Sequence, residues 1–161
     1  MSDALYYERP VLLNRDKHRH RKVLPSTSYA FAQKANSLYL AGVEFNAACK
    51  EYAIVFTRAA DGRTVPVAML GLRSRENLFV DEEGRWSGTY VPAFVRRYPF
   101  VFSTAADRQT LTLCIDEAHK GVNREGKGRR LFDDDGRRAG LRLAKSVATT
   151  TGVIIGTYEP A

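Results

Sequence analysis

Short apolar runs separated by turns that contain Asp and Gly recur along this chain, and this alternation constrains its fold more than any other feature. The run YAIVFT (52–57) is followed by Asp61-Gly62 and then by the run TVPVAMLGL (64–72). Asp-Gly between two such runs is a strong signal for a two-stranded β-hairpin. The second run contains Pro66, which cannot donate a ladder hydrogen bond, so we expect that strand to lie at a sheet edge or to bulge.

A second hairpin pattern follows, in which the runs NLFV (77–80) and RWSGTYV (85–91) flank the acidic turn DEEG (81–84). Ahead of the first hairpin, one principal amphipathic helix is predicted near residues 37–51, because apolar side chains recur there at spacings of three and four: Leu38, Ala41, Phe45, Ala48 and Tyr52. In a chain of 161 residues that is 44% apolar, these patterns predict a single α+β domain. We expect mainly an antiparallel sheet of β-hairpins, with that one helix.

The acidic turn has a near copy later in the chain, since LFVDEEGR (78–85) resembles LFDDDGR (131–137). A calcium-binding EF-hand loop needs an oxygen ligand at its first position and Gly at its sixth. Counting back from each glycine puts Phe79 and Leu131 in that first position. Asp and Gly are favoured in turns for backbone reasons alone, so the motif predicts turns and no metal site.

Other signatures of cofactors and catalysis are weak. The two cysteines, Cys49 and Cys114, are isolated from one another, and no glycine-rich phosphate-binding motif is present. Asp116 and His119 are close enough in sequence to form an acid–base pair, but a polar cluster at a strand end explains them equally well. We therefore expect no cofactor and a non-enzymatic role.

The formal net charge of +7 would favour an anionic partner if the basic residues formed one continuous surface. They are instead mixed with acidic residues such as the run 133–135, so nucleic acid is not an expected partner. The sequence has no apolar stretch long enough for a membrane span and no signal-peptide pattern. We expect a protein that is cytoplasmic or that reaches the cell surface by a signal-peptide-independent route.

The segment WSGTYVPAFVRRYPFVF (86–102) combines the chain's single tryptophan with several rings and an arginine pair. Aromatic platforms for nucleic-acid bases need exposed rings, whereas these rings alternate with valines, which favours a core that buries Phe94, Tyr98, Phe100 and Phe102. Its arginines are the best candidates for a binding role, through charge-assisted hydrogen bonds to a small anionic ligand. The candidate ligand-binding residues are Trp86, Tyr90, Arg96, Arg97 and Tyr98.

Several segments, in their order along the chain, resemble the bacterial SapC family: YYERPVLLNRDKH, FAQKANSLYLAGVEFNAACKEYAIVF, PVAMLGLRSRENLFVDEEGRW, YVPAFVRRYPFVF, LCIDE and LFDDDG. The resemblance covers roughly Tyr6 to Gly136 and is most specific in the middle. It implies a structural role in or associated with the bacterial surface layer, with self-association or surface-layer components as partners. The residues that match the family's shorter motifs are His18, Glu44, Asn77 and Asp116.

The end of the chain departs from the family pattern. We expect a SapC-like α+β domain over residues 1–136 and an atypical basic tail over 137–161, where the family's usual C-terminal region is lacking through truncation or a shifted reading frame. Two hypotheses for function remain open. One is a structural surface-layer protein, and the other is a cytoplasmic accessory module that binds a small anionic ligand through the segment Tyr90 to Tyr98.

Overall fold

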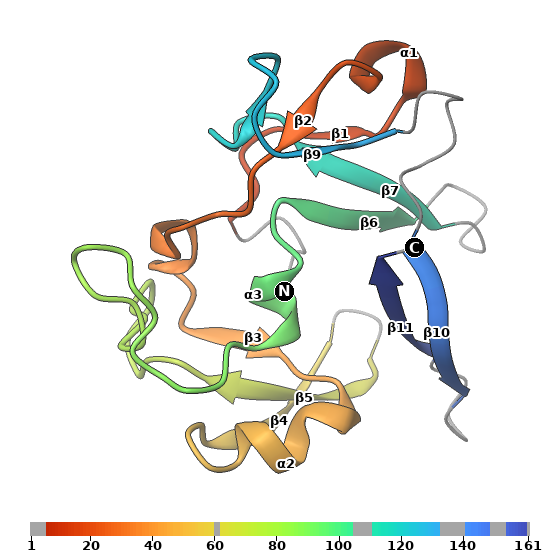
Figure 1. Cartoon of the computed structure of the whole chain (residues 1–161). Coiled ribbons are helices and arrows are strands. Elements are labelled where there is room, and N and C mark those ends of the chain that lie inside the picture. The colour runs from red at the N-terminus through yellow and green to blue at the C-terminus, as the bar shows by residue number, and fades with distance from the viewer. Residues whose placement is uncertain (1–5, 60–61, 105–110, 133–140, 149–153, 161) are drawn as a thin grey trace. The chain divides into compact units, whose positions relative to one another are not determined.

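The computed structural model describes residues 6–59, 62–104, 111–132, 141–148 and 154–160. It is an α+β structure of short helices and antiparallel strands, as predicted (Figure 1). The chain divides into two compact units. The first unit comprises Met1–Leu12 and Ser26–His119, and the second comprises Leu13–Pro25 and Lys120–Ala161.

The first unit contains two three-stranded antiparallel sheets. One has the order β3 (Ser37–Tyr39), β5 (Thr64–Met69), β4 (Ile54–Arg58), and the other has the order β1 (Pro10–Leu12), β7 (Leu111–Asp116), β6 (Phe100–Thr104). Strands β4 and β5 form the hairpin predicted at Asp61-Gly62, with Val55 opposite Val67. The helical segments are η1 (Ala30–Ala32), η2 (Gly42–Glu44), α2 (Phe45–Ala48) and α3 (Ala93–Arg96).

The second unit contains helix α1 (Arg15–His18) and strand β2 (Lys22–Val23), which lies between β8 (Val122–Asn123) and β9 (Arg129–Arg130). It also contains the antiparallel hairpin of β10 (Leu141–Ala148) and β11 (Ile154–Pro160). Asn14 caps α1, because its side chain accepts hydrogen bonds from the backbone N–H groups of Asp16 and Lys17. The second acidic turn, 133–136, lies outside the described residues.

The helix predicted near residues 37–51 is shorter than expected. Residues 37–39 form β3, and Leu38 lies opposite Ala68 of β5, so only Gly42 to Ala48 is helical. Pairing with a distant strand outweighs the local helical spacing at Leu38, since it buries that side chain almost completely. The predicted apolar face is still largely buried, because Ala48 and Tyr52 also reach the core.

The edge position predicted from Pro66 is wrong, because β5 is the central strand of its sheet. The ladder tolerates proline there because Pro66 faces β3 where β3 ends. Leu40 N–H, just past the end of β3, donates to the Pro66 carbonyl at 3.0 Å. The missing proline N–H therefore falls at the last rung of the β3–β5 pairing rather than in its middle.

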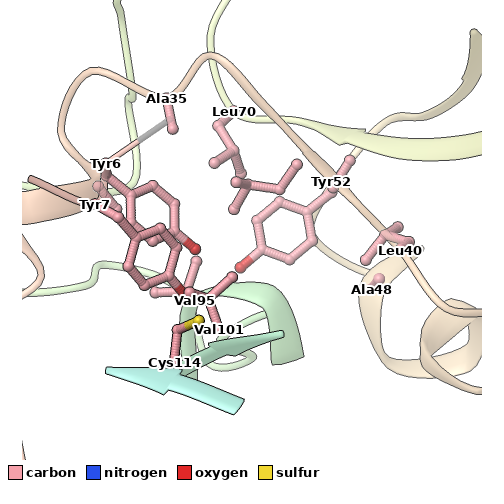
Figure 2. Packing of buried hydrophobic residues seen from close by; sticks show 13 residues of the cluster. Tyr6, Tyr7, Ala35, Leu40, Ala48, Tyr52, Leu70, Val95, Val101 and Cys114 are labelled. Atoms are coloured by element: carbon pink, nitrogen blue, oxygen red, sulfur yellow. The ribbon is translucent and has the colours of Figure 1, made fainter. Parts of the chain in front are cut away.

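The core of the first unit is built from small aliphatic side chains and a large share of aromatic ones. Figure 2 shows Tyr6 and Tyr7 on one side of Val95 and Tyr52 on the other. Phe94 and Tyr98 pack against this cluster, as expected for the 86–102 segment. Phe100 is only partly buried and is not among the side chains that pack against this cluster, so it does not fully meet the same expectation.

Phe102 does not follow that expectation, since it is 52% exposed. Successive side chains of a strand point to opposite faces, and in β6 it is Val101 that points into the core. None of the helices in the described part of the chain is long and apolar enough to cross a membrane.

Candidate functional site

The hairpin formed by residues 77–80 and 85–91 leads into the aromatic segment 86–102 and is stabilised by its acidic turn, residues 81–84. Val80 and Trp86 form a β-bridge across it, and Gly84 N–H donates to the Asp81 carbonyl at 3.0 Å. The Asp81 carboxylate accepts from the Arg85 backbone N–H at 2.7 Å and from the Arg85 guanidinium at 2.8 Å. These bonds lower the pKa of Asp81, and they give this carboxylate the role of a turn residue, as predicted.

Trp86 belongs to the aromatic core. Its ring lies 6.0 Å from that of Phe79 in a stacked arrangement and 5.6 Å from that of Tyr29 edge-on. Its indole N–H donates to the Tyr52 hydroxyl at 3.0 Å. The Tyr52 hydroxyl in turn donates to the Tyr90 carbonyl. Burial raises the pKa of Tyr52 to about 12, so this phenol is protonated at neutral pH.

Glu44 is a buried carboxylate that joins three parts of the fold. Its Oε2 accepts from Ala41 N–H at 2.8 Å at the start of η2. Its Oε1 accepts from the Tyr90 hydroxyl and from Ala93 N–H, both at 2.8 Å. Because Ala93 is the first residue of α3, the carboxylate satisfies one of the N–H groups that a helix start leaves unpaired.

Glu51 holds the chain just before Tyr90. Its Oε1 accepts from the backbone N–H groups of Thr89 and Tyr90, both at 3.0 Å. Its Oε2 lies where any side chain at Gly88 would have to go, since a β-carbon there would come within 2.4 Å of that oxygen. The sequence carries no local signal for Glu51, because its partners lie almost forty residues away in the chain.

The two adjacent arginines, Arg96 and Arg97, point to different partners. Arg96 Nε donates to the Val91 carbonyl at 2.9 Å, and its guanidinium carbon lies 5.7 Å from the centre of the Tyr90 ring. A second donor of Arg96 reaches the Tyr90 hydroxyl at 3.4 Å. The Arg97 guanidinium carbon lies 3.7 Å from the centre of the Phe94 ring, a close cation–π contact.

Tyr98 lies in a second aromatic group. Its ring stacks on Phe31 at 4.0 Å and meets His119 edge-on at 5.1 Å. Burial raises the pKa of Tyr98 to about 12, and the negative charge of Asp116 adds to this effect. Tyr98 is therefore a neighbour of His119, whose backbone N–H also donates to the Asp116 carbonyl at 3.2 Å. The acid–base pairing of the Asp116 and His119 side chains stays a hypothesis.

Asp116 is fully buried, and its carboxylate is engaged by backbone groups. It accepts from Glu8 N–H at 3.0 Å, from Arg9 N–H at 2.9 Å and from Ala118 N–H at 3.0 Å. These bonds fasten the residues before β1 to the end of β7. A general base must be reached by the proton that it abstracts, whereas the oxygens of Asp116 are occupied by these fixed donors.

The predicted candidates thus fall into two groups. Trp86, Tyr90 and Arg96 are connected, with Tyr52 between Trp86 and Tyr90, while Tyr98 belongs with Asp116. The fifth candidate, Arg97, packs on Phe94. Sequence reasoning missed Glu51 and Tyr52, which support the first group. Among the residues that the structure describes, no three His, Cys, Asp or Glu side chains gather in a way that could hold a metal ion.

The remaining motif residues also make structural contacts. In the second unit, His18 is completely buried, and its Nδ1 lies 2.8 Å from the Asn14 carbonyl and 2.9 Å from the Asn14 nitrogen. In the first unit, the Asn77 amide donates to the Ala32 carbonyl at 3.0 Å and accepts from Phe79 N–H at 2.9 Å. His18 thus holds the backbone at the start of α1, and Asn77 joins two backbone segments of the first unit.

A comparison with protein-family models decides the relationship of this chain to known proteins. The SapC family model matches residues 13–149. The chain belongs to the SapC family. The match extends to residue 149 and therefore includes the first part of the segment 137–161. No curated protein and no solved structure matches this SapC chain.

Proposed function

We propose that this SapC chain is a non-enzymatic protein with a structural role in or associated with the bacterial surface layer. The observation that carries the proposal is that polar side chains at the candidate site form hydrogen bonds within the protein itself. In the segment that is densest in rings and arginines, the polar groups of Trp86, Tyr90 and Arg96 bond to the protein's own backbone and side chains. Such a segment acts as a scaffold rather than as a reaction centre.

The carboxylates support the same role. The hydrogen bonds that Glu44, Glu51 and Asp116 accept come mainly from backbone N–H groups. Carboxylates held in this way stabilise loop and strand geometry. The raised pKa values of Tyr52 and Tyr98 make both phenols weaker acids than an ordinary tyrosine, so both stay protonated well above neutral pH.

A structural role between proteins also needs contact surfaces. The first unit leaves several large apolar side chains exposed, among them Leu72 at 89%, Leu78 at 68% and Phe56 at 65%. Large apolar side chains on the surface can be buried in contacts between proteins, which removes apolar area from water. They are compatible with self-association or binding to other surface-layer components.

The test is the location of the endogenous protein. Intact cells that make it are treated with a protease, beside lysed cells, while a cytosolic marker reports leakage. The proposal predicts digestion on intact cells with the marker protected. Protection of the protein until lysis contradicts a surface-layer role.

The geometry of Arg96 favours a second candidate, an accessory module that binds a small anionic ligand. Arg96 is exposed, and its contacts with Val91 and Tyr90 hold the guanidinium in place before any ligand arrives. Such preorganisation lowers the entropic cost of binding. Arg97 and the rings of Trp86 and Tyr90 complete the proposed site, whereas Tyr98 lies in the second aromatic group.

Calorimetry with inorganic phosphate tests this candidate. Binding should weaken at least several-fold in the Arg96→Ala and Arg97→Ala variants while the fold is retained. Arg73→Ala is the matched control, because Arg73 is an exposed arginine in another loop. Absence of binding to the unaltered protein, or equal binding by all the variants, rejects the candidate for phosphate-like anions.

A further inference from the structure

Strand β4 has an open edge. In the β4–β5 ladder the hydrogen bonds from Met69 N–H to the Ala53 carbonyl and from Ala59 N–H to the Arg63 carbonyl fix which residues of β4 face β5. By alternation, Val55 and Thr57 also face β5. The backbone N–H and C=O groups of Ile54, Phe56 and Arg58 therefore point away from it.

The described strands leave this edge without a neighbour, since β4 pairs only with β5 among them (Figure 1). Protein edges are usually blocked by Lys, Pro, bulges or inward-pointing charges. Here the strand is Ile-Val-Phe-Thr-Arg, its one charge is at the end, and Phe56 and Val55 are 65% and 41% exposed. The edge has the features of a strand that accepts another strand.

We infer that this edge binds β4 of a second copy of the chain, in antiparallel orientation and centred on Phe56. The three outward-facing residues are spaced symmetrically about Phe56, so the strand is complementary to itself. Phe56 lies opposite Phe56 of the second copy, and Ile54 lies opposite its Arg58. Each of these pairs exchanges two backbone hydrogen bonds, as hydrogen-bonded antiparallel pairs do.

The charge pattern favours this arrangement. Antiparallel pairing puts Arg58 of each copy beside an isoleucine and places the two arginines at opposite ends of the contact. Parallel pairing would place Arg58 beside Arg58, and like charges directly opposite one another are destabilising. The two phenylalanines at the centre add an aromatic pair, and the twofold symmetry closes the contact at two copies.

This inference deepens the proposed structural role by naming one contact between copies. The pairing joins two three-stranded sheets into one continuous sheet of the order β3-β5-β4-β4-β5-β3. It does not depend on where in the cell the protein lies. A dimer that stays protected from protease until lysis contradicts only the surface-layer role, and a monomer on the cell surface contradicts only the pairing.

The mass of the purified full chain in solution, measured by light scattering over a range of concentrations, gives the first test. We expect a dimer that dissociates on dilution. Phe56→Lys should raise the dissociation constant of the dimer at least tenfold, because it places two positive charges opposite one another at the centre of the contact. Leu72→Lys, which alters a side chain that is more exposed but lies off this edge, should leave the dimer unchanged.

A second variant tests the backbone hydrogen bonds of the pairing. Phe56→Pro removes an N–H that points away from β5, so the β4–β5 ladder keeps its hydrogen bonds and the chain should fold as a monomer. Circular dichroism checks the fold of each variant. A monomeric unaltered chain at every concentration, or a Phe56→Pro variant that still dimerises, overturns the inference.

A cysteine crosslink tests the register. In a Cys49→Ser background, Phe56→Cys should form an intermolecular disulfide under mild oxidation, because hydrogen-bonded antiparallel partners have Cα atoms about 5.5 Å apart, within the range of a disulfide. Leu72→Cys should not crosslink efficiently. A dimer that crosslinks no better through residue 56 than through residue 72 overturns the assigned pairing.

Discussion

At the scale of single residues, three carboxylates accept hydrogen bonds from backbone N–H groups and so hold the chain in place. Glu44 and Glu51 hold the segment from Thr89 to Ala93, and Asp116 holds the residues before β1. Each accepts hydrogen bonds from parts of the chain that are distant in sequence. A buried donor left without its partner costs far more than an exposed one, so these residues should be sensitive to small chemical changes.

Glu44→Gln tests this sensitivity. The amide keeps the size of the carboxyl group, but its NH2 must face either Ala41 N–H or the pair formed by the Tyr90 hydroxyl and Ala93 N–H. We expect a loss of about 1–3 kcal/mol in the free energy of unfolding, measured by urea denaturation. The control is Glu83→Gln, an exposed position where the change should be within about 0.5 kcal/mol. Equal effects of the two variants would contradict the capping role.

Because the pKa values of Tyr52 and Tyr98 are raised, the free energy of unfolding should fall at high pH. Their folded-state pKa values are about 12, against 10.0 for an ordinary tyrosine. Below pH 10 both the folded and the unfolded chain hold these protons, and the stabilising contribution is complete. Between pH 10 and 12 the unfolded chain releases them first, so the free energy of unfolding falls by up to about 1.4 kcal/mol per pH unit for each group.

Urea denaturation at pH 8.5 and at pH 11 measures this fall, and absorbance at 295 nm follows the tyrosines directly. Two of the eight tyrosines should titrate last. Tyr98→Phe should make the decline in stability shallower. A single transition near pH 10 for all tyrosines would show that neither phenol is buried as described.

At the scale of elements, the acidic turn before Trp86 depends on a glycine. Gly84 has φ +79°, and a β-carbon there would lie 2.0 Å from the Ser28 hydroxyl oxygen. The Gly84 carbonyl also accepts from Tyr29 N–H at 2.7 Å, which joins this turn to the loop before η1. The turn therefore needs glycine both for its backbone conformation and for the close approach of Ser28.

Gly84→Ala should destabilise the protein by more than about 1 kcal/mol, because it combines a left-handed conformation with a steric clash. Gly42→Ala is the matched control, since no atom lies within 4 Å of a β-carbon at Gly42 and its φ is not left-handed. We expect that control to be neutral or slightly stabilising. Thermal melts of both variants provide the measurement, and equal melting temperatures would contradict the assignment.

The elements also show what the sequence could reveal. The β4–β5 hairpin and the turn at Gly84 were predictable because Asp and Gly encode turn geometry locally. The strand formed by residues 37–39 and the central position of the strand with Pro66 were not predictable, because strand order depends on pairing with distant segments. For the site, the core position of Phe94 and Tyr98 followed from the valines around them. The capping bonds of Glu51 and Asp116 join residues far apart in sequence, and no local pattern encodes them.

At the scale of the whole molecule, the SapC chain places its densest motif inside a fold and leaves a strand edge and several apolar side chains exposed. This distribution favours contacts with other protein molecules over chemistry on a small substrate. The proposed structural role rests on this distribution together with the family, and the proposed pairing through β4 adds one contact between copies.

Cys49 gives the most direct measurement of that role. It is an exposed free thiol, whereas Cys114 is buried and has a raised pKa, so a membrane-impermeant maleimide should react with Cys49 alone in the folded protein. Cells that make the protein are labelled intact and after lysis, with a Cys49→Ser strain and a cytosolic thiol protein as controls. A surface-layer role predicts labelling of Cys49 on intact cells while the cytosolic protein stays unlabelled. Labelling of Cys49 only after lysis would contradict it.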